Sequence, residues 1–375
     1  MSKLNKRKIL LNPGPATTSR GVKEALIIDD ICPREKEFEK LTRGIMNGLL
    51  SVIEADSSKY ACVLFAGSGT LAMESVITSF PDKDDEILIL SNGAYGKRFS
   101  EIAQRYSVKH HVLDIDWNKK IDHASVENIL TANSNIKYVY YIHHETTTGI
   151  ANNITELNKL IHKYRKISVV DAISSFAGIP IYAKRDEIDF IISSSNKCIQ
   201  GMPGVSFVIG RKDYINNLRH TAKRSYYTDL YDQYSNFEKN NQFRFTPPVQ
   251  VLYSLQRAIN EFFQEGGVEG RYKRYSENYD FLKKELKQIG FKFLFNDKVE
   301  SKILMTVLYP DDGNFDFNVL HDKLYAKGFT IYPGMLQDKE KTFRLSVLGD
   351  LYLQDISEFI KELKNSLAEM NVRFY

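Results

Sequence analysis

A lysine and an aspartate stand near the ends of two apolar runs, where they could share one pocket. Asp171 closes the run that begins at Lys166, and Lys197 follows the run Asp189–Ser194. Such runs are typical of buried parallel strands, whose carboxyl ends meet at one edge of a sheet. A lysine amine bonds covalently to an aldehyde, and a carboxylate keeps a pyridine nitrogen protonated. Pyridoxal 5′-phosphate (PLP) carries both groups, so the pair predicts a PLP site. Taken singly, the two residues could instead be a helix N-cap and a surface lysine.

A glycine-rich turn could hold the phosphate of such a cofactor. Gly67-Ser68-Gly69-Thr70 follows the first buried run and opens the helical segment Leu71–Phe80. Glycine lets the backbone approach an anion closely, and the free N–H groups of a helix start bind phosphate. A plain tight turn is the alternative interpretation, and the position after the first strand favours phosphate binding.

Aromatic and hydroxyl side chains follow two further strands. Tyr95 lies in Asn92-Gly93-Ala94-Tyr95-Gly96, so its ring could stack on a planar cofactor or pack as an ordinary tyrosine. His143-His144-Glu145 precedes three threonines, 146–148, whose hydroxyls could bond a ring oxygen or form a turn. Neighbouring residues of a strand point to opposite faces, so His143 and His144 do not suit one shared ion, and we predict no metal site.

An arginine lies inside an apolar strand near the C-terminus. Arg344 occurs in Phe-Arg-Leu-Ser-Val-Leu-Gly. A buried guanidinium needs an anionic partner, because leaving it unpaired is costly. The partner is either the carboxylate or phosphonate of a substrate, or a structural Asp or Glu.

The elements that must position these residues alternate between strand and helix from about residue 60 to 210. The strand-like runs are Cys62–Ala66, Ile87–Leu90, Tyr138–Ile142, Ser168–Val170, Phe190–Ile192 and Val205–Ile209. Helical periodicity appears between them at Leu71–Phe80, Arg98–Arg105 and Ile154–Arg165. This order predicts right-handed βαβ units, and hence an α/β fold with a mostly parallel sheet covered on both faces.

The pattern changes after Pro247-Pro248. Two long helices, Val249–Gln264 and Val268 to about Ile289, are separated by Gly266-Gly267, and short strands then alternate with the helices Phe315–Lys327 and Leu353–Glu369. We therefore expect a smaller α+β domain at 256–375, a large domain at 21–255, and an N-terminal segment, 1–20, over the active site.

Composition excludes several classes of protein. The 375 residues are 43% hydrophobic and carry a net charge of +4, with basic and acidic residues interspersed, which does not favour a nucleic-acid or membrane surface. No apolar run approaches the roughly 18 residues of a membrane span. Cys32, Cys62 and Cys198 are an odd, widely spaced set that predicts neither a disulfide framework nor a zinc site, so we expect a cytoplasmic protein.

These motifs together resemble the class V, fold-type I family of PLP-dependent aminotransferases over nearly the whole chain. The matching stretches are 11–20, 67–70, 91–96, 144–149, 170–180, 194–201, 244–248 and 331–334. Ser-Ser-Asn-Lys-Cys-Ile-Gln-Gly (194–201) and Glu-Thr-Thr-Thr-Gly (145–149) resemble the phosphonate-specific subgroup in particular.

The resemblance implies a role for each matching residue. Lys197 would bind the PLP aldehyde, Asp171 would pair with the pyridine nitrogen, Tyr95 would stack on the ring, and Thr146 would reach its phenolic oxygen. The phosphate would be held by Ser68, Gly69, Thr70 and Asn196, and by Thr246 of the neighbouring subunit in a homodimer with shared active sites. Arg344 would bind the acidic group of the substrate, beneath a segment that includes Pro15. Arg34 would line the substrate pocket or begin a solvated charged helix.

The activity that the resemblance implies is transfer of the amino group of 2-aminoethylphosphonate to pyruvate, giving phosphonoacetaldehyde and L-alanine with ping-pong kinetics. An alanine– or serine–glyoxylate aminotransferase is the alternative with the same chemistry. A cysteine desulfurase would need a cysteine well after the lysine, and none follows Cys198. A PLP-binding regulator without turnover would be expected to carry a DNA-binding module or to lack the lysine.

Overall fold

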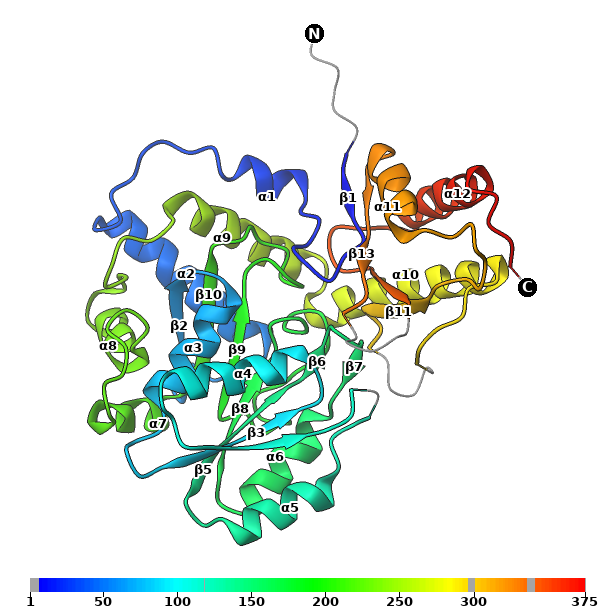
Figure 1. The fold of residues 1–375 in the computed structure, drawn as a ribbon. Helices are drawn as coiled ribbons and strands as arrows, with labels where there is room; N and C mark the ends of the chain where they lie inside the picture. Colours follow the sequence, from blue (N-terminus) through cyan, green and yellow to red (C-terminus); the bar gives the residue numbers. More distant parts are fainter. Residues whose placement is uncertain (1–6, 118, 296–300, 336–340, 375) are drawn as a thin grey trace.

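A seven-stranded sheet forms the centre of the molecule (Figure 1). The computed structural model describes residues 7–117, 119–295, 301–335 and 341–374. Across the sheet the strands are β2 (Tyr60–Ala66), β10 (Val205–Arg211), β9 (Phe190–Ser194), β8 (Ile167–Asp171), β5 (Ile136–Ile142), β3 (Glu86–Ser91) and β4 (His110–Asp114). Every apolar run predicted as a strand lies within one of these elements or overlaps it.

The sheet is mostly parallel, as predicted, with one reversed strand. β10 pairs antiparallel with both β2 and β9, while the pairs β9–β8, β8–β5, β5–β3 and β3–β4 are parallel. Only residues 195–204 separate β9 from β10, and a parallel return would need a crossover of a dozen or more residues. The short connection therefore reverses the chain, and it is this connection that carries Lys197.

Helices follow the parallel strands and pack on the sheet. α3 (Gly69–Ser79) lies over β9 and β10, and α4 (Ala94–Arg105) lies over β3, β4 and β5, on the face that is turned toward the viewer in Figure 1. α6 (Ile154–Lys163) packs on β8 and against α5 (His123–Ala132). α2 (Lys36–Val52) contacts β2 and α9 (Val249–Gln264), while α7 (Lys212–Asn217) and α8 (Leu230–Asn240) lie near the β2 end of the sheet.

A second, smaller group of elements follows α9. The long helix α10 (Gly267–Ile289) packs against α12 (Leu353–Glu369), beside a three-stranded antiparallel sheet of β11 (Leu304–Leu308), β14 (Thr342–Ser346) and β13 (Tyr332–Pro333). α11 (Phe317–Ala326) contacts α12 as well.

The apolar residues form two buried clusters. One is built on the seven-stranded sheet, and the other is built from the C-terminal elements together with Ile9, Leu11 and Ala16. α9, in which the predicted boundary at residue 255 lies, contributes Leu252 and Phe262 to the first cluster. The division of the chain at residues 20 and 255 stays a prediction.

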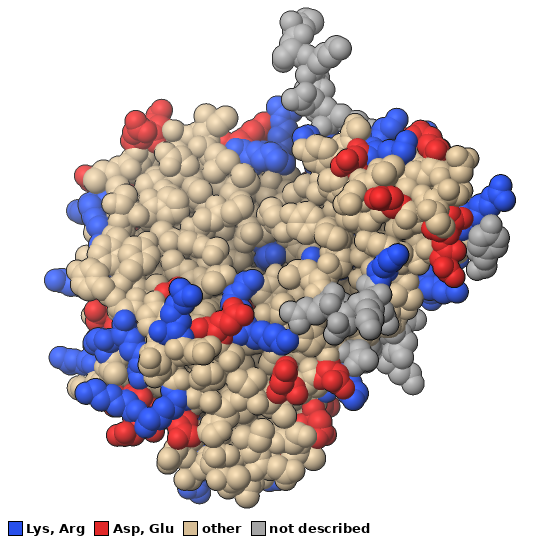
Figure 2. Space-filling model, in the orientation of Figure 1, with Lys and Arg blue, Asp and Glu red and all other residues tan. Residues whose placement is uncertain are grey.

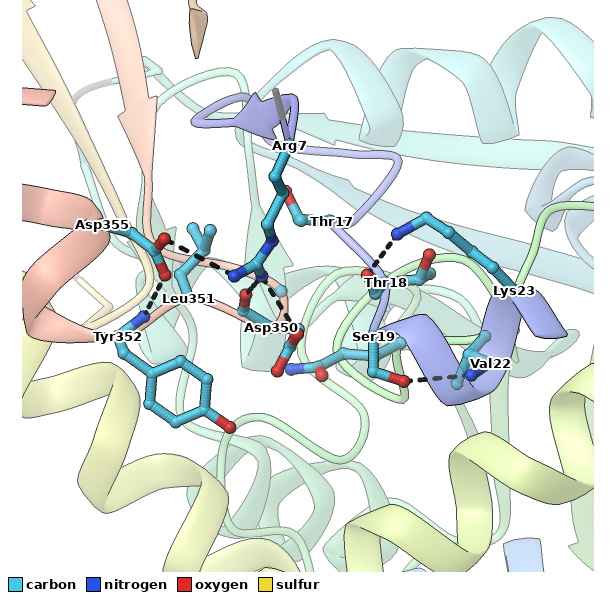
Figure 3. Close-up of polar contacts among 12 residues, drawn as sticks. Arg7, Thr17, Thr18, Ser19, Val22, Lys23, Asp350, Leu351, Tyr352 and Asp355 are labelled. Carbon is cyan, nitrogen blue, oxygen red and sulfur yellow. Dashed lines mark hydrogen bonds and ion pairs between the residues drawn. The ribbon is translucent and has the colours of Figure 1, made fainter. Parts of the chain in front are cut away.

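The N-terminal segment packs with the C-terminal elements. β1 (Ile9–Leu10) pairs with β12 (Phe329–Thr330), and Thr17 forms an isolated bridge with Gly349. Figure 3 shows Arg7 reaching two carboxylates, with Nη2 at 3.0 Å from Asp350 Oδ2 and Nη1 at 3.5 Å from Asp355 Oδ1. The following short helix, α1 (Arg20–Glu24), begins at Ser19, whose Oγ accepts a bond from the Val22 N–H. Residues 11–18 are thus anchored at both ends.

Within the described ranges, none of the helices combines the length and the apolar character that crossing a membrane requires.

Candidate active site

A cavity of about 150 Å³ lies where the carboxyl ends of the parallel strands meet. Its walls come from segments that follow five strands: β2, β3, β5, β8 and β9. The lining residues are Ser68, Gly69, Thr70, Tyr95, Arg98, Ile142, His144, Asp171, Ile173, Ser174, Ser194, Asn196 and Lys197. Figure 2 shows lysine or arginine side chains within a hollow near the middle of this face, surrounded by uncharged residues. The structure therefore brings together seven of the residues that the sequence assigns to the cofactor.

Lys197 contacts the N-terminal segment across the cavity. Its Nζ donates a hydrogen bond to the Pro13 carbonyl oxygen at 2.8 Å. Gly14 is so close that a Cβ there would come within 2.1 Å of the Lys197 Nζ, and its φ of +131° disfavours other residues as well. The loop behind the lysine is fixed by the buried Arg271, whose Nη1 donates to the Cys198 carbonyl at 2.6 Å. The N-terminal segment thus contacts Lys197 directly, and its place over the active site stays a prediction.

Asp171 ends β8 and is only 3% exposed. Its Oδ1 accepts a bond from the Ile173 N–H at 2.8 Å, and no ion pair of the described residues includes it. Burial raises the pKa of this carboxyl to about 7, with a further contribution from the negative charge of Glu145. Burial likewise lowers the pKa of the Lys197 ammonium to about 8, and the positive charge of Arg344 adds to that shift. A positively charged partner in the cavity would stabilise the ionised Asp171 carboxylate, and a negatively charged partner would stabilise the Lys197 ammonium.

The start of α3 faces the cavity with open N–H groups. Ser68 is the N-cap, and its hydroxyl makes no capping bond to the helix. Gly69 admits the Ile173 side chain, because a Cβ on it would lie 2.8 Å from Ile173 Cδ1. Across the cavity, Asn196 Oδ1 accepts a bond from Ser194 Oγ at 2.9 Å. This end of the cavity has the donors that an anion such as phosphate requires.

Tyr95 and Arg98 both extend from the first turns of α4. The Arg98 guanidinium lies 4.7 Å from the centre of the Tyr95 ring, and its Nη1 donates to Thr70 Oγ1 at 3.2 Å. Sequence reasoning did not single out Arg98. The feature of the sequence that could have identified Arg98 is its spacing of three residues from Tyr95, which places both side chains on one face of a helix.

Two predicted residues lie beside the cavity rather than on its walls: Thr146 and Arg344. The Thr146 hydroxyl is buried and has no hydrogen-bond partner in the described part of the protein. Arg344 is 4% exposed and donates to the carbonyls of Thr146 at 3.0 Å and Pro333 at 3.1 Å. No Asp or Glu among the described residues forms an ion pair with Arg344, and burial lowers its pKa.

The two histidines have separate surroundings. His143 Nδ1 lies 2.8 Å from Ser175 Oγ, whereas His144 lines the cavity and has its Nε2 2.7 Å from Ser301 Oγ. Burial lowers the pKa of His143 to about 3 and that of His144 to about 4, so both rings are neutral at physiological pH. His144 thus ties the cavity to the C-terminal elements.

Three further predicted residues do not line the cavity of their own chain. Pro15 and Thr246 are exposed. Arg34 is exposed too, and its guanidinium donates to the carbonyls of Phe243 and Arg244, so it braces the segment that leads to Thr246. Their assigned roles remain predictions.

Glu145 has a structural role that the sequence did not predict. The sequence places it beside two histidines and at the start of the block 145–149, and neither setting predicts a role for its carboxylate. In the structure its side chain is fully buried and bonds to the start of α4, about 50 residues earlier in the chain. An acid next to a buried strand was the available signal, but its partners could not be identified from the sequence.

Known proteins resemble this chain along most of its length. The family model described as aminotransferase class-V matches residues 27–311. A 2-aminoethylphosphonate–pyruvate transaminase of Bacillus thuringiensis (strain Al Hakam) is 40% identical over 361 residues, which cover 96% of this chain and 98% of that protein. A transaminase of the same name from Bacteroides fragilis (strain YCH46) is 38% identical over 360 residues, with the same coverage.

Among solved structures, an alanine–glyoxylate aminotransferase from Nostoc sp. matches with a TM-score of 0.89 at 23% identity, covering 98% of this chain and 97% of that one. This likeness confirms the fold that the sequence predicted.

Proposed function

This chain belongs to the class V aminotransferase family, and we propose that it transfers the amino group of 2-aminoethylphosphonate to pyruvate, giving phosphonoacetaldehyde and L-alanine. The observation that carries the proposal is the identity of 38% and 40%, over 96% of the chain, to two transaminases named for these substrates. The site supports it with a buried aspartate and a half-buried lysine on the cavity wall and, beside the cavity, a buried arginine that has no acidic partner among the described residues.

PLP is the proposed cofactor, and the residues fit it at three places. The Thr146 hydroxyl is buried without a partner and suits the phenolic oxygen. Asp171 is a buried carboxylate without a cation and suits a protonated ring nitrogen. The uncapped start of α3, with Ser68, Gly69 and Thr70, and the side chain of Asn196 suit the phosphate. When bound, PLP supplies an aldehyde that carries the amino group and a ring that accepts electrons.

Lys197 has two tasks in this proposal. Its amine would hold the aldehyde of the cofactor in the resting enzyme and, once a substrate is bound, would move a proton from the carbon that bears the nitrogen. A pKa of about 8 leaves an appreciable fraction of the amine unprotonated near neutral pH, as a base requires. Asp171 assists by holding a proton at the ring nitrogen.

Arg344 would bind the acidic end of both substrates. A guanidinium forms paired, charge-assisted hydrogen bonds with a carboxylate or a phosphonate. Two carbonyl acceptors, those of Thr146 and Pro333, already fix its orientation before any substrate arrives. Because one arginine serves 2-aminoethylphosphonate and then pyruvate, the two would bind in turn, as in ping-pong kinetics.

We further propose a homodimer in the cytoplasm. Thr246 is exposed next to an aromatic surface that includes Tyr226, Tyr227 and Phe245, where a second copy could bring Thr246 to its cavity. The segment that includes Pro15 and the residue Arg34 would then border the substrate entrance.

Product analysis tests the substrate assignment. The purified protein with PLP is supplied with 2-aminoethylphosphonate and pyruvate, and L-alanine and phosphonoacetaldehyde are quantified. Lys197→Ala is the control and should abolish both products. Turnover of alanine or serine with glyoxylate, and none with 2-aminoethylphosphonate, would instead support the glyoxylate alternative.

A further inference from the structure

The structure assigns a positioning role to Glu145: its buried carboxylate caps α4 and thereby holds Tyr95 and Arg98 on the wall of the cavity. This inference rests on the proposed function in one respect, the binding of PLP in that cavity. It concerns a residue that is not among the groups proposed to touch the cofactor or the substrate.

The carboxylate satisfies the N–H groups at the start of α4. Glu145 Oε2 accepts a bond from the Tyr95 N–H at 3.1 Å, and Thr147 Oγ1 accepts a longer one from the Ala94 N–H at 3.4 Å. Glu145 Oε1 in turn accepts bonds from Thr147 N at 3.1 Å and Thr147 Oγ1 at 2.6 Å. Because the first N–H groups of a helix have no partner within it, these bonds fix where α4 begins.

Gly93 leaves the space that Glu145 fills. It is the N-cap of α4 and has no side chain with which to cap the helix. A Cβ on Gly93 would lie 2.3 Å from Cγ and Cδ of Glu145. While Glu145 occupies this space, position 93 therefore cannot carry a residue with a side chain. Glu145 therefore takes over the task that a Ser or Asp N-cap performs in other helices.

Charge also favours this arrangement. Glu145 is 0% exposed and belongs to no ion pair of the described residues. Burial raises the pKa of Glu145, so the ionised form needs compensation, and the positive end of the α4 dipole supplies part of it, since a carboxylate is stabilised at a helix N-terminus. Its charge also acts on two other groups of the site, because it raises the pKa of Asp171 and opposes the lowering of the pKa of Arg344.

The residues that α4 carries make this cap important for the cavity. Tyr95 lies in the first turn and itself carries the N–H that Glu145 binds, and Arg98 follows three residues later with its guanidinium over the Tyr95 ring. A shift of this turn would move both side chains relative to Asp171 at the end of β8 and Lys197 on the connection after β9. Glu145 therefore sets the plane on which a cofactor ring would stack.

The test compares Glu145→Gln with Asp186→Asn in the full-length protein. Asp186 is the control, because it is also a buried carboxylate, 2% exposed, that accepts a bond from a backbone N–H, that of Tyr182 at 2.8 Å. It pairs with Arg185 and bonds to Thr155 as well, and none of these partners lines the cavity. Two readouts report on the cavity: the circular dichroism of bound PLP in the visible region, and the Kd of PLP for the cofactor-free protein. Thermal unfolding reports on the fold alone.

We expect Glu145→Gln to change the sign or intensity of the visible dichroism and to raise the Kd of PLP about tenfold. Asp186→Asn should lower the unfolding temperature, because it weakens the pair with Arg185, and should leave both cavity readouts as in the wild type. A merely structural role for Glu145 would move the two variants together, and that result would overturn the inference.

A rescue variant keeps the test decisive if Glu145→Gln folds poorly. Glu145→Ala clears the space beside Gly93, whose φ of 171° is extended backbone, so Gly93→Asp in the same chain can supply a local cap. The double variant should recover the dichroism and the Kd of PLP toward wild-type values, and equal defects in the single and double variants would contradict capping. Neither readout uses an amino donor, so an error in the substrate assignment would leave both unchanged.

Discussion

The Nζ of Lys197 donates a 2.8 Å hydrogen bond to the carbonyl oxygen of Pro13, 184 residues earlier in the chain. The N-terminal segment therefore forms part of the wall around the lysine. It is held there by the Ala16 N–H, which donates to the Asn196 carbonyl at 2.9 Å, and by the bridge between Thr17 and Gly349. Changes in this segment should affect the lysine directly.

Gly14→Ala should disable the lysine without unfolding the protein. The new Cβ would come within 2.1 Å of the Lys197 Nζ and would need a strained φ of +131°. We expect transaminase activity to fall by about 100-fold, because the reacting group is displaced. Gly313→Ala is the control, since a Cβ there meets nothing within 4 Å, and it should retain full activity. Similar activities of the two variants would show that the segment tolerates the displacement.

Asp171→Asn should make the cofactor-free protein more stable and should lower the activity of the protein with its cofactor. The pKa of Asp171 is raised to about 7, so the folded state keeps a proton that the unfolded chain loses above pH 4 or so. Its carboxyl therefore costs stability increasingly as the pH rises from about 4 to 7, and the cost is complete above that range. We expect the variant to unfold at a higher temperature than the wild type at pH 8, and at nearly the same temperature at pH 4. Activity should decrease by about 10³-fold. A variant that is less stable at pH 8 would contradict the raised pKa.

Arg344→Lys should weaken the binding of both substrates. An ammonium cannot reproduce a paired contact with a carboxylate or a phosphonate while it also bonds the carbonyls of Thr146 and Pro333. We expect KM for 2-aminoethylphosphonate and for pyruvate to rise by about 10- to 100-fold, with a smaller change in kcat. Arg257→Lys is the matched control, because its guanidinium is exposed on α9 and pairs only with Glu261 among the described residues. An increase in KM for only one substrate would argue against a shared binding arginine.

His162→Gln should lower stability only at acidic and neutral pH. Its hydrogen bond to Asp189 raises the pKa of this imidazole, and the nearby Glu187 adds to the effect. The stabilisation is complete below the ordinary pKa of about 6.5 and is lost as the pH rises through the raised value. At pH 6 the free energy of unfolding should therefore be about 1 kcal/mol lower in the variant than in the wild type, and the variant should unfold at a lower temperature. The difference should shrink by pH 9. His220→Gln, on an exposed residue, should show no such dependence.

The periodicity of the sequence was sufficient to locate most of the central elements. Val249–Gln264 and Leu353–Glu369 were predicted with the bounds that α9 and α12 have, because both helices have an apolar stripe and a clear end. β4 was missed, since this edge strand has no fully buried residue and reads as polar. α4 was expected to start at Arg98 and starts at Ala94, because its first turn depends on the distant Glu145.

The sequence predicted many of the residues that line the site, but it did not predict the tertiary contacts that hold them in place. Lys197, Asp171 and the glycine-rich turn stand at strand ends, and strand ends of parallel sheets converge whatever the details of packing. The contact of Pro13 with Lys197, the cap of Glu145 on α4 and the anchor of Arg271 on the Cys198 carbonyl all join residues far apart in the chain. Such contacts depend on tertiary packing, which no local pattern encodes.

A single half-reaction shows whether the protein accepts the amino group of 2-aminoethylphosphonate. The protein loaded with PLP is mixed with 2-aminoethylphosphonate, alanine, serine or β-alanine in the absence of an acceptor, and the absorbance of the aldehyde form of the cofactor is followed. We expect rapid conversion to the amine form with 2-aminoethylphosphonate and recovery of the aldehyde form on adding pyruvate. Conversion by serine or alanine, reversed by glyoxylate, with no response to 2-aminoethylphosphonate, would contradict this expectation.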